Sequence, residues 1–387
     1  MASFDYKDLL KEYNKFTSPK MVVLVKDKNV AEDSNHFSIS DVEIEMSAGY
    51  EAGMATFWIY DCYDKVRGEF RTKELKPYIC LGSQVTICLG YDLTVRKIFC
   101  GFIARVNFEF PESGIPGVEI TVLDAKGIMM ANNHSQQLKA KCYSDAVKEI
   151  FRKPAYSKLQ EMNVITGVTV EDTPDKLANS TGDDSASDKT VEMVGESDYE
   201  FVVKAAKKFN YDFFVHGGEI LFRKAKSNTE VLFEITPETG VHTIQMSYDI
   251  TGLNAEIEVR CLDVGKGKMI SASKKNDGKI SHGSMAKSIL SKSKKVYIDP
   301  TTASKQDAEN RLDYLMEDMV YRFGYLEAEL VGIPEIVPGR FVKVDGFGED
   351  LNNLFYLQTV KHCFTDRGYV TKIIGKAKSF QESILGV

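Results

Sequence analysis

The sequence is poor in several residues and patterns that mark common classes of function. It has one tryptophan, Trp58, in 387 residues, which is little provision for a sugar-stacking cleft. No apolar run reaches the roughly 18 residues that a membrane-spanning helix needs. Residues 1–16 contain acidic side chains and no apolar core, so they do not read as a signal peptide. We expect a protein that is synthesised in the cytosol and has no membrane anchor.

Cysteine and histidine show no pattern of a metal or redox site. The seven cysteines are odd in number and no two form a CxxC pair, so we expect reduced thiols in the core. The histidines form no HExxH motif, and neighbours His362 and Cys363 would point to opposite faces of a strand. The residues are Cys62, Cys80, Cys88, Cys100, Cys142, Cys261 and Cys363, with His36, His134, His216, His242, His282 and His362.

Two glycine-containing stretches fail as nucleotide-binding loops. Residues 265–269, GKGKM, carry Met269 where a phosphate loop has the Ser or Thr that holds magnesium. Residues 346–350, GFGED, lack the third glycine of a dinucleotide loop. Carboxylates are plentiful, but sequence alone cannot place two of them across a sugar. We therefore expect no enzyme and assign no catalytic, cofactor-binding or metal-binding residue.

Composition indicates a large globular protein with several domains. A chain of 387 residues with 43% apolar residues is too long for one ordinary core, so two or three domains are expected. The net charge of −7, from 56 acidic and 49 basic side chains, gives no reason to expect a dedicated nucleic-acid site.

The first third of the chain is rich in short strand patterns. β-Branched and aromatic residues recur there, and several alternate with polar ones, as in a half-buried strand. Six such strands closed by turns predict a β-sandwich or barrel. The expected strands are residues 21–25, 39–46, 54–60, 84–91, 97–110 and 116–124.

From residue 126 the pattern changes to helices mixed with strands. Residues 144–151 predict a helix with Ser144 as its N-cap, and residues 171–190 have too few large apolar side chains to order and predict a linker or exposed loop. Ser197 and Glu200 form a capping box that opens a helix ending at Asn210. A β-hairpin follows, turning at Gly217 and Gly218, which tolerate positive φ angles.

A lysine-rich stretch interrupts the strands of the last third. Residues 264–296 contain nine lysines and one acid, Asp277, a net of 9 − 1 = +8. Two interpretations stay open: a docking arm for an acidic partner or phosphate backbone, and a solvated flexible loop. The expected elements around it are strands at 231–236, 241–248, 253–262, 325–332, 354–364 and 368–380 and a helix at 303–320 whose apolar face is Ala308, Leu312, Leu315, Met316 and Met319.

Two distant stretches share one pattern. Gly82, Val85 and Ile87 match Gly339, Val342 and Val344 at a constant offset of 257 residues (342 − 85). The same offset carries Phe99 onto Tyr356 and Ile103 onto Val360, and an offset of 251 carries Gly117 onto Gly368. These matches predict an internal duplication.

Three stretches carry a resemblance to a known family. Residues 195–222, GESDYEFVVKAAKKFNYDFFVHGGEILF, resemble a segment of the late-control protein D family of phage tail hubs and of VgrG spike proteins. Residues 329–377 are similar to the second barrel of these proteins, and residues 85–106 to the first. Unlike VgrG proteins, which continue into an OB-fold and a needle, this chain ends at Val387, which implies a separate spike protein.

The resemblance implies a mainly β fold with an α+β insertion: two tail-tube-like β-barrel domains and a smaller α/β domain, assembled as a trimeric pseudo-six-fold ring. The expected domains are residues 1–125, 126–235 and 236–387, the last with a Lys-rich loop at 264–296. The implied function is a structural baseplate hub of a phage tail, R-type bacteriocin or contractile injection system.

The implied partners are two further copies of the chain, the tail tube protein, a separate spike protein, and tape-measure and baseplate wedge proteins. The implied location is the baseplate of a virion tail or tail-like particle, after synthesis in the bacterial cytoplasm. Two alternatives stay open: a hub with a peptidoglycan-hydrolase site in residues 126–235, and a cell-surface glycan-binding module.

Overall fold

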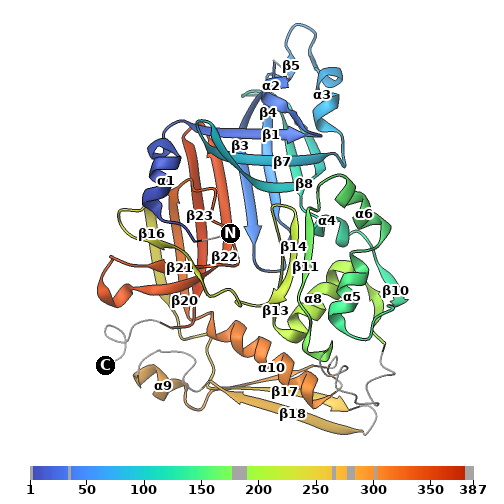
Figure 1. Ribbon diagram of the computed structural model, residues 1–387, viewed down its shortest axis with the longest axis vertical. Coiled ribbons are helices and arrows are strands. Elements are labelled where there is room, and N and C mark those ends of the chain that lie inside the picture. The colour runs from blue at the N-terminus through green and yellow to red at the C-terminus, as the bar shows by residue number, and fades with distance from the viewer. Residues whose placement is uncertain are drawn as a thin grey trace.

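The computed structural model describes residues 3–33, 36–176, 190–263, 267–276, 284–299, 302 and 304–379. One large sheet dominates the molecule, with a mixed helical and strand unit at its side and a small sheet covered by a helix below it (Figure 1). The prediction of a mainly β protein is confirmed. The division at residues 125 and 235 stays a prediction.

The large sheet has thirteen strands, and its pairing is antiparallel except between β15 and β21. Along its main path the order is β16-β20-β23-β22-β3-β4-β9-β8-β7-β1-β2, and β21 joins β22 to β15. The strands are β1 Pro19–Val25, β2 Lys28–Asn29, β3 Ser38–Ser47, β4 Met54–Tyr60, β7 Gln84–Tyr91, β8 Thr94–Glu109, β9 Gly117–Leu123, β15 Val231–Ile235, β16 Val241–Tyr248, β20 Gly324–Val331, β21 Phe341–Val344, β22 Asn353–Thr365 and β23 Gly368–Ala377.

Alternation along these strands builds one continuous core. In β4, for example, Ala55, Phe57 and Ile59 are fully buried while the residues between them are partly exposed, as expected of a sheet with one face on the core. The same core contains residues of β20, β22 and β23, so strands from both ends of the chain share it. Small elements at its margin are α1 Tyr6–Glu12, η1 Asn14–Phe16, α2 Val30–Asp33, β5 Tyr63–Asp64, β6 Glu69–Phe70, α3 Thr72–Ile79 and η3 Glu349–Leu351.

The unit at the side of the sheet follows β9 and has its own core. Helix α8 begins as predicted: the Ser197 hydroxyl accepts from the Glu200 N–H at 3.1 Å, and the Glu200 carboxylate accepts from the Ser197 N–H at 2.8 Å. The hairpin after it turns at Gly217 and Gly218, both with positive φ, as predicted. The unit contains α4 Lys126–Met129, β10 His134–Gln137, α5 Tyr143–Ile150, α6 Pro154–Glu161, β11 Gly167–Val170, β12 Glu192–Glu196, α8 Asp198–Phe209, β13 Tyr211–His216 and β14 Glu219–Lys224.

One helix start in this unit differs from the prediction. Ser144 lies inside α5, and the N-cap is Cys142. The Ser144 N–H donates to the Thr173 hydroxyl at 2.9 Å, and the Tyr143 N–H donates to the Asp175 carboxylate at 2.9 Å. Two side chains some thirty residues away therefore cap the helix, which a local sequence pattern cannot reveal. Most of the expected 171–190 loop lies outside the described residues.

The unit below the large sheet corrects the interpretation of the lysine-rich stretch as a loop. Two segments of the lysine-rich stretch form strands on either side of β17 Glu256–Asp263. They are β18 Lys268–Lys275 and β19 Lys294–Ile298. Two of the lysines have acidic partners outside residues 264–296, since Lys294 lies 2.8 Å from Glu256 and Lys274 pairs with Asp313. Residues 264–266 and 277–283 lie outside the described residues.

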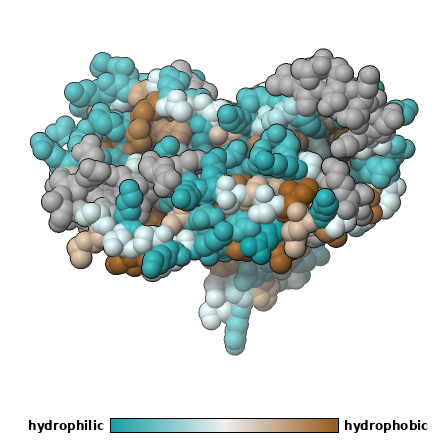
Figure 2. Space-filling model, turned by 90° about the horizontal axis from the view of Figure 1, so that it is seen from below, coloured by the Kyte–Doolittle hydropathy of each residue, from teal (hydrophilic) through white to brown (hydrophobic). Residues whose placement is uncertain are grey.

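Helix α10 covers this small sheet. It runs from Lys305 to Val320 after the N-cap Ser304, and buries the predicted face of Ala308, Leu312, Leu315, Met316 and Met319. The short helix α9, Ser284–Leu290, completes the unit. Seen from below, the molecule shows a mostly hydrophilic surface with separate small apolar patches (Figure 2). No described helix is both long and apolar enough to cross a membrane.

Candidate functional site

The large sheet contains the same five-strand arrangement twice. In the first strand unit the pairing order is β3-β4-β9-β8-β7, and in the second strand unit it is β16-β20-β23-β22-β21. When the strands of each unit are numbered along the chain, both orders read first, second, fifth, fourth, third. All of these neighbouring strands pair antiparallel. The two units therefore share a topology, which supports the predicted duplication.

Equivalent hydrogen bonds fix the correspondence at one turn. Gly82 and Gly339 have φ angles of +77° and +79°, a conformation that glycine adopts without a steric penalty. The Gly82 N–H donates to the Ile103 carbonyl at 2.8 Å, and the Gly339 N–H donates to the Leu357 carbonyl at 2.9 Å. In return, the Ile103 N–H donates to the Ser83 carbonyl and the Leu357 N–H donates to the Arg340 carbonyl. Ser83 directly follows Gly82, and Arg340 directly follows Gly339.

The correspondence extends across each unit as a row of opposed residues. In the first unit the row is Ile44, Ala55, Val122 and Ile103; in the second it is Met246, Leu326, Gly375 and Leu357. Both units also have a bulge immediately after the last residue of the row, before Arg105 in β8 and before Thr359 in β22.

This row corrects part of the predicted register. The match of Gly82 and Val85 to Gly339 and Val342 agrees with the structure, but Ile103 corresponds to Leu357 and not to Val360. The offset there is 357 − 103 = 254, and for Val122 and Gly375 it is 253. The assignments of Phe99 to Tyr356 and of Gly117 to Gly368 are therefore wrong. Alternating strands repeat every two residues and bulges break the alternation, so letter matches alone could not fix the register.

The two strand units meet along one backbone junction. Residues 359–364 of β22 pair with residues 42–47 of β3, and the Ala48 N–H donates to the Gln358 carbonyl at 2.8 Å. Val42, Ile44 and Met46 are buried at this junction. On the polar side Lys361 lies 2.8 Å from Glu43. The junction makes the two units one continuous sheet.

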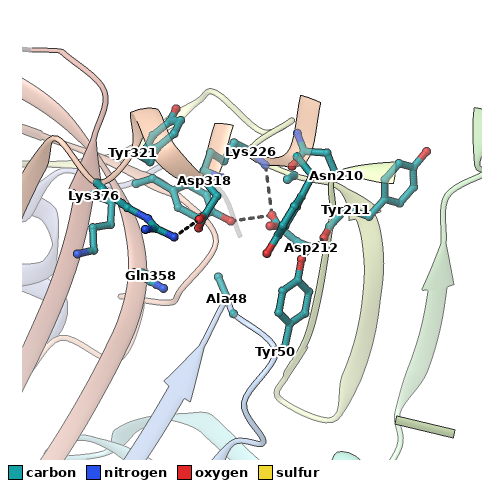
Figure 3. A pocket seen from close by; sticks show the side chains of 15 residues that line it. Ala48, Tyr50, Asn210, Tyr211, Asp212, Lys226, Asp318, Tyr321, Gln358 and Lys376 are labelled. Carbon is teal, nitrogen blue, oxygen red and sulfur yellow. Dashed lines mark hydrogen bonds and ion pairs between the residues drawn. The ribbon is translucent and has the colours of Figure 1, made fainter. Parts of the chain in front are cut away.

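A cavity of about 290 Å³ lies where the large sheet meets the other two units (Figure 3). Its walls come from the loop after β3, from β13, from α10 and from β22 and β23. Asp212 is buried there: its carboxylate accepts from the Tyr356 hydroxyl at 2.7 Å and from the Lys226 N–H at 3.2 Å. Lys226 Nζ lies 4.6 Å from the centre of the Tyr321 ring.

Burial controls the electrostatics of this cavity. It raises the pKa of the Asp212 carboxyl, against the lowering effect of Lys226 and the Tyr356 hydrogen bond. It also raises the pKa of the Tyr50 and Tyr356 hydroxyls. The residues lining the cavity include no serine, cysteine or histidine. The buried network joins the large sheet to the other two units.

None of the histidines in the described part of the chain lines this cavity. His362 is fully buried, with Nε2 3.1 Å from the Ile336 carbonyl and Nδ1 2.8 Å from the Tyr369 hydroxyl. Since a carbonyl only accepts, Nε2 carries a proton, and the low pKa that burial gives the ring leaves Nδ1 free to accept at pH 7. Burial lowers the pKa of His362 to about 3. Among the described residues no three His, Cys, Asp or Glu side chains group as metal ligands do.

One buried lysine was not predicted from the sequence. Lys126 follows β9, and its Nζ donates to the Glu51 carbonyl at 2.8 Å, which ties the start of the side unit to the loop after β3. Burial lowers the pKa of Lys126 to about 8. Asp124 lies beside it and accepts from the Gly53 N–H at 2.7 Å. The Asp-Ala-Lys sequence directly after a strand was the only local signal.

The fold is that of phage tail proteins. The tail protein from Neisseria meningitidis MC58 superimposes with a TM-score of 0.65 at 12% identity, covering 96% of this chain and 100% of that one. The 43 kDa tail protein of prophage MuSo2 from Shewanella oneidensis gives 0.65 at 11% identity, covering 92% and 98%. A type VI secretion component of E. coli, the c3393 protein, gives 0.52 at 12% identity, covering 88% and 73%.

The family itself comes from a sequence model. The model described as the Alg8 N-terminal domain matches residues 17–366, which is most of the chain. The chain therefore belongs to the Alg8 N-terminal domain family. This match does not bear out late-control protein D as the specific family, although the neighbours agree with the wider tail resemblance. No curated protein matches the sequence.

Proposed function

We propose that this chain is a structural baseplate hub of a phage tail or of a phage-tail-like contractile injection system. In this proposal three copies form a ring that connects a hexameric tail tube to a trimeric spike made of a separate polypeptide. The chain is synthesised in the bacterial cytoplasm and ends in the baseplate of the assembled particle.

The observation that carries the proposal is the pair of equivalent strand units in one continuous sheet. Three chains with two units each present six similar units, while the side and lower units occur once per chain. Such a ring is pseudo-six-fold on the face built by the strand units and three-fold wherever the other units project. Closed cyclic symmetry is the usual way for identical chains to bury complementary surfaces. The likeness of the fold to phage tail proteins supports the same role.

The mass of the purified chain in solution tests the trimer. One chain has a mass of 43.4 kDa, so light scattering should give three times that value at micromolar concentration. Binding of the trimer to rings of the cognate tube protein, followed by electron microscopy of assembled particles, tests the location. A monomer at every concentration, or a ring of another order, would refute the trimeric hub.

The absence of enzymatic activity is part of the proposal. The alternative hydrolase has one structural candidate, the cavity at Asp212, because Asp318 also lines it and two carboxyl groups can serve acid and base roles. Zymography on cell walls distinguishes the two. We expect no clearing by the purified chain. Clearing that disappears with Asp212→Asn, in a variant that still melts cooperatively, would favour the hydrolase. A glycan-binding module would instead retain sugars on a glycan array.

A further inference from the structure

The junction between β22 and β3 provides a template for a contact that this chain makes with a copy of itself. We propose that residues 105–110, at the end of β8, pair with residues 244–249, along β16, of the next copy. The register is the one that the internal junction sets. This inference rests on the proposed trimeric hub and adds to it the strands and residues that join one subunit to the next.

The proposed edges correspond to the two strands of the internal junction: the edge of β8 to β22, and the edge of β16 to β3. Residues 105–110 correspond to residues 359–364 of β22 through the offset of 254. Residues 244–249 correspond to residues 42–47 of β3, since Met246 and Ile44 begin the same cross-sheet row and 246 − 44 = 202.

Neither edge has a strand partner within the described part of the chain. Pairing of β8 with β7 ends at Gln84 opposite Phe102, and beyond it β8 pairs on its other side with β9. Strand β16 is the end of the sheet and pairs with β20. Strand β16 lies at one end of the strand order and β8 lies seven strands further along it, so one copy can offer one edge where its neighbour offers the other. Such a head-to-tail contact closes into a ring when its rotation allows.

When the register of the β22–β3 junction is applied to β8 and β16, side chains of similar or complementary chemistry face each other. Phe108 falls opposite Met246, and Phe110 falls opposite Ile244. The polar residues next to the phenylalanines also face each other, Asn107 with Ser247 and Glu109 with Gln245. At the start of the segment Arg105 meets Asp249, of opposite charge. A shift by one residue would place the phenylalanines opposite polar side chains, so this register is the one that pairs like with like.

Exposure shows which contacts the single chain lacks. His362, the counterpart of Phe108 at the internal junction, is 0% exposed, whereas Phe108 is 43% exposed and Phe110 is 61% exposed. On the other edge Val42 and Ile44 are buried, while their counterparts Ile244 and Met246 are only partly buried. A second copy in this register would cover the apolar positions that the internal junction already covers.

A cysteine pair tests the register directly. Because the Ala48 N–H donates to the Gln358 carbonyl, Glu45 and Lys361 occupy a non-hydrogen-bonded position of the template, where Cα atoms lie about 4.5 Å apart. Asn107 and Ser247 are their counterparts. The full chain carrying Asn107→Cys and Ser247→Cys should form disulfides between copies under mild oxidation, since this spacing lies within disulfide geometry. We expect a ladder up to a covalent trimer on a non-reducing gel.

Three controls run beside it. The pair Glu45→Cys with Lys361→Cys should close within one chain and add no higher band. Each single variant and the parent chain give the background from the native thiols. The pair Asn107→Cys with Gln245→Cys is diagonal in the proposed register, with Cα atoms roughly 7–8 Å apart. Its yield of linked chains should be at least about tenfold lower.

The outcomes distinguish a failure of the proposed strand register from a failure of the proposed trimeric hub. A trimeric mass with efficient linkage at 107 and 247 supports both. A trimeric mass without that linkage, or with preferential linkage at 107 and 245, overturns the register and leaves the hub in place. A chain that stays monomeric in solution, with no linkage, overturns the contact and the trimeric hub together.

Discussion

The first and second strand units use one backbone plan with different edges. Where β22 meets β3 inside the chain, the central position holds His362, a polar ring with both nitrogens hydrogen-bonded in the core. At the matching position of β8 stands Phe108, an apolar ring that is partly exposed. A polar residue with fixed partners suits a permanent internal junction, while an aromatic residue suits an edge that exchanges water for a partner.

The units differ also in what is inserted between their strands. Between β3 and β4 there is a short loop, residues 48–53, whereas the corresponding gap between β16 and β20 holds the whole lower unit with β17, β18, β19, α9 and α10. The insertion leaves the sheet pairing on either side unchanged. The duplicated plan therefore tolerates a large addition at a loop, as surface connections commonly do.

The largest expected effect comes from charging the shared core. Val85 and Val342 occupy the same place in the two units, and both are fully buried. Val85→Asp and Val342→Asp should each lower the free energy of unfolding by roughly 4 kcal/mol or more, because a carboxylate without a partner is forced into the core. Chemical denaturation measures the loss. Val66→Asp, at a site that is 96% exposed, is the control and should change stability by less than about 0.5 kcal/mol.

A second substitution separates folding from assembly. Phe108→Asp should weaken the association of subunits at least a hundredfold while the monomer still melts cooperatively, because the side chain is 43% exposed in the single chain, beside the Phe70 ring, and becomes fully covered only in the ring of subunits. Light scattering over a dilution series measures it. Leu93→Asp, on the exposed turn between β7 and β8, is the matched control and should remain trimeric. Loss of the monomer fold in Phe108→Asp would show that the edge serves the subunit itself.

Sequence reasoning succeeded where the signal was local. The capping box at Ser197, the glycine hairpin and the apolar face of α10 all depend on residues within a few positions of each other, and all three are confirmed. The repeat was visible at Gly82 and Gly339 because glycine at positive φ is a strong constraint.

What depended on distant residues could not be predicted. The register of the second unit depends on bulges, the start of α5 on Thr173 and Asp175, and the lysine-rich strands on carboxylates such as Glu256. The cavity at Asp212 joins three units, so no single stretch of sequence marks it. The free edges of β8 and β16 became visible only once the internal junction was known.

The equivalent glycines provide a finer comparison of the two units. Both have positive φ, so replacement by alanine costs each about 1 kcal/mol of backbone strain. A Cβ at Gly82 would meet no atom within 4 Å, whereas at Gly339 it would lie 2.7 Å from the Phe214 ring. Gly339→Ala should therefore destabilise the protein by about 2–3 kcal/mol, and Gly82→Ala by about 1 kcal/mol. Equal losses in denaturation would mean that Phe214 moves aside without cost.

The smallest expected effect is a pH dependence carried by the residue that distinguishes the two units. His362→Phe gives the second unit the residue of the first. At pH 7 the substitution should cost about 2–3 kcal/mol of stability, since the Ile336 carbonyl and Tyr369 hydroxyl lose their buried partner.

The pH dependence follows from the pKa of His362, which burial lowers to about 3. Below pH 6.5, the ordinary pKa of histidine, the unfolded chain binds a proton at this side chain while the folded chain does not. The histidine therefore makes the parent less stable as the pH falls from 6.5, by up to about 1.4 kcal/mol per unit. His216 and the carboxyl groups are common to both chains and cancel in the difference. The gap between parent and variant should narrow by about 1–2 kcal/mol between pH 7 and pH 5, measured by denaturation at each pH, whereas a constant gap would mean that His362 takes up a proton in the folded state as readily as in the unfolded one.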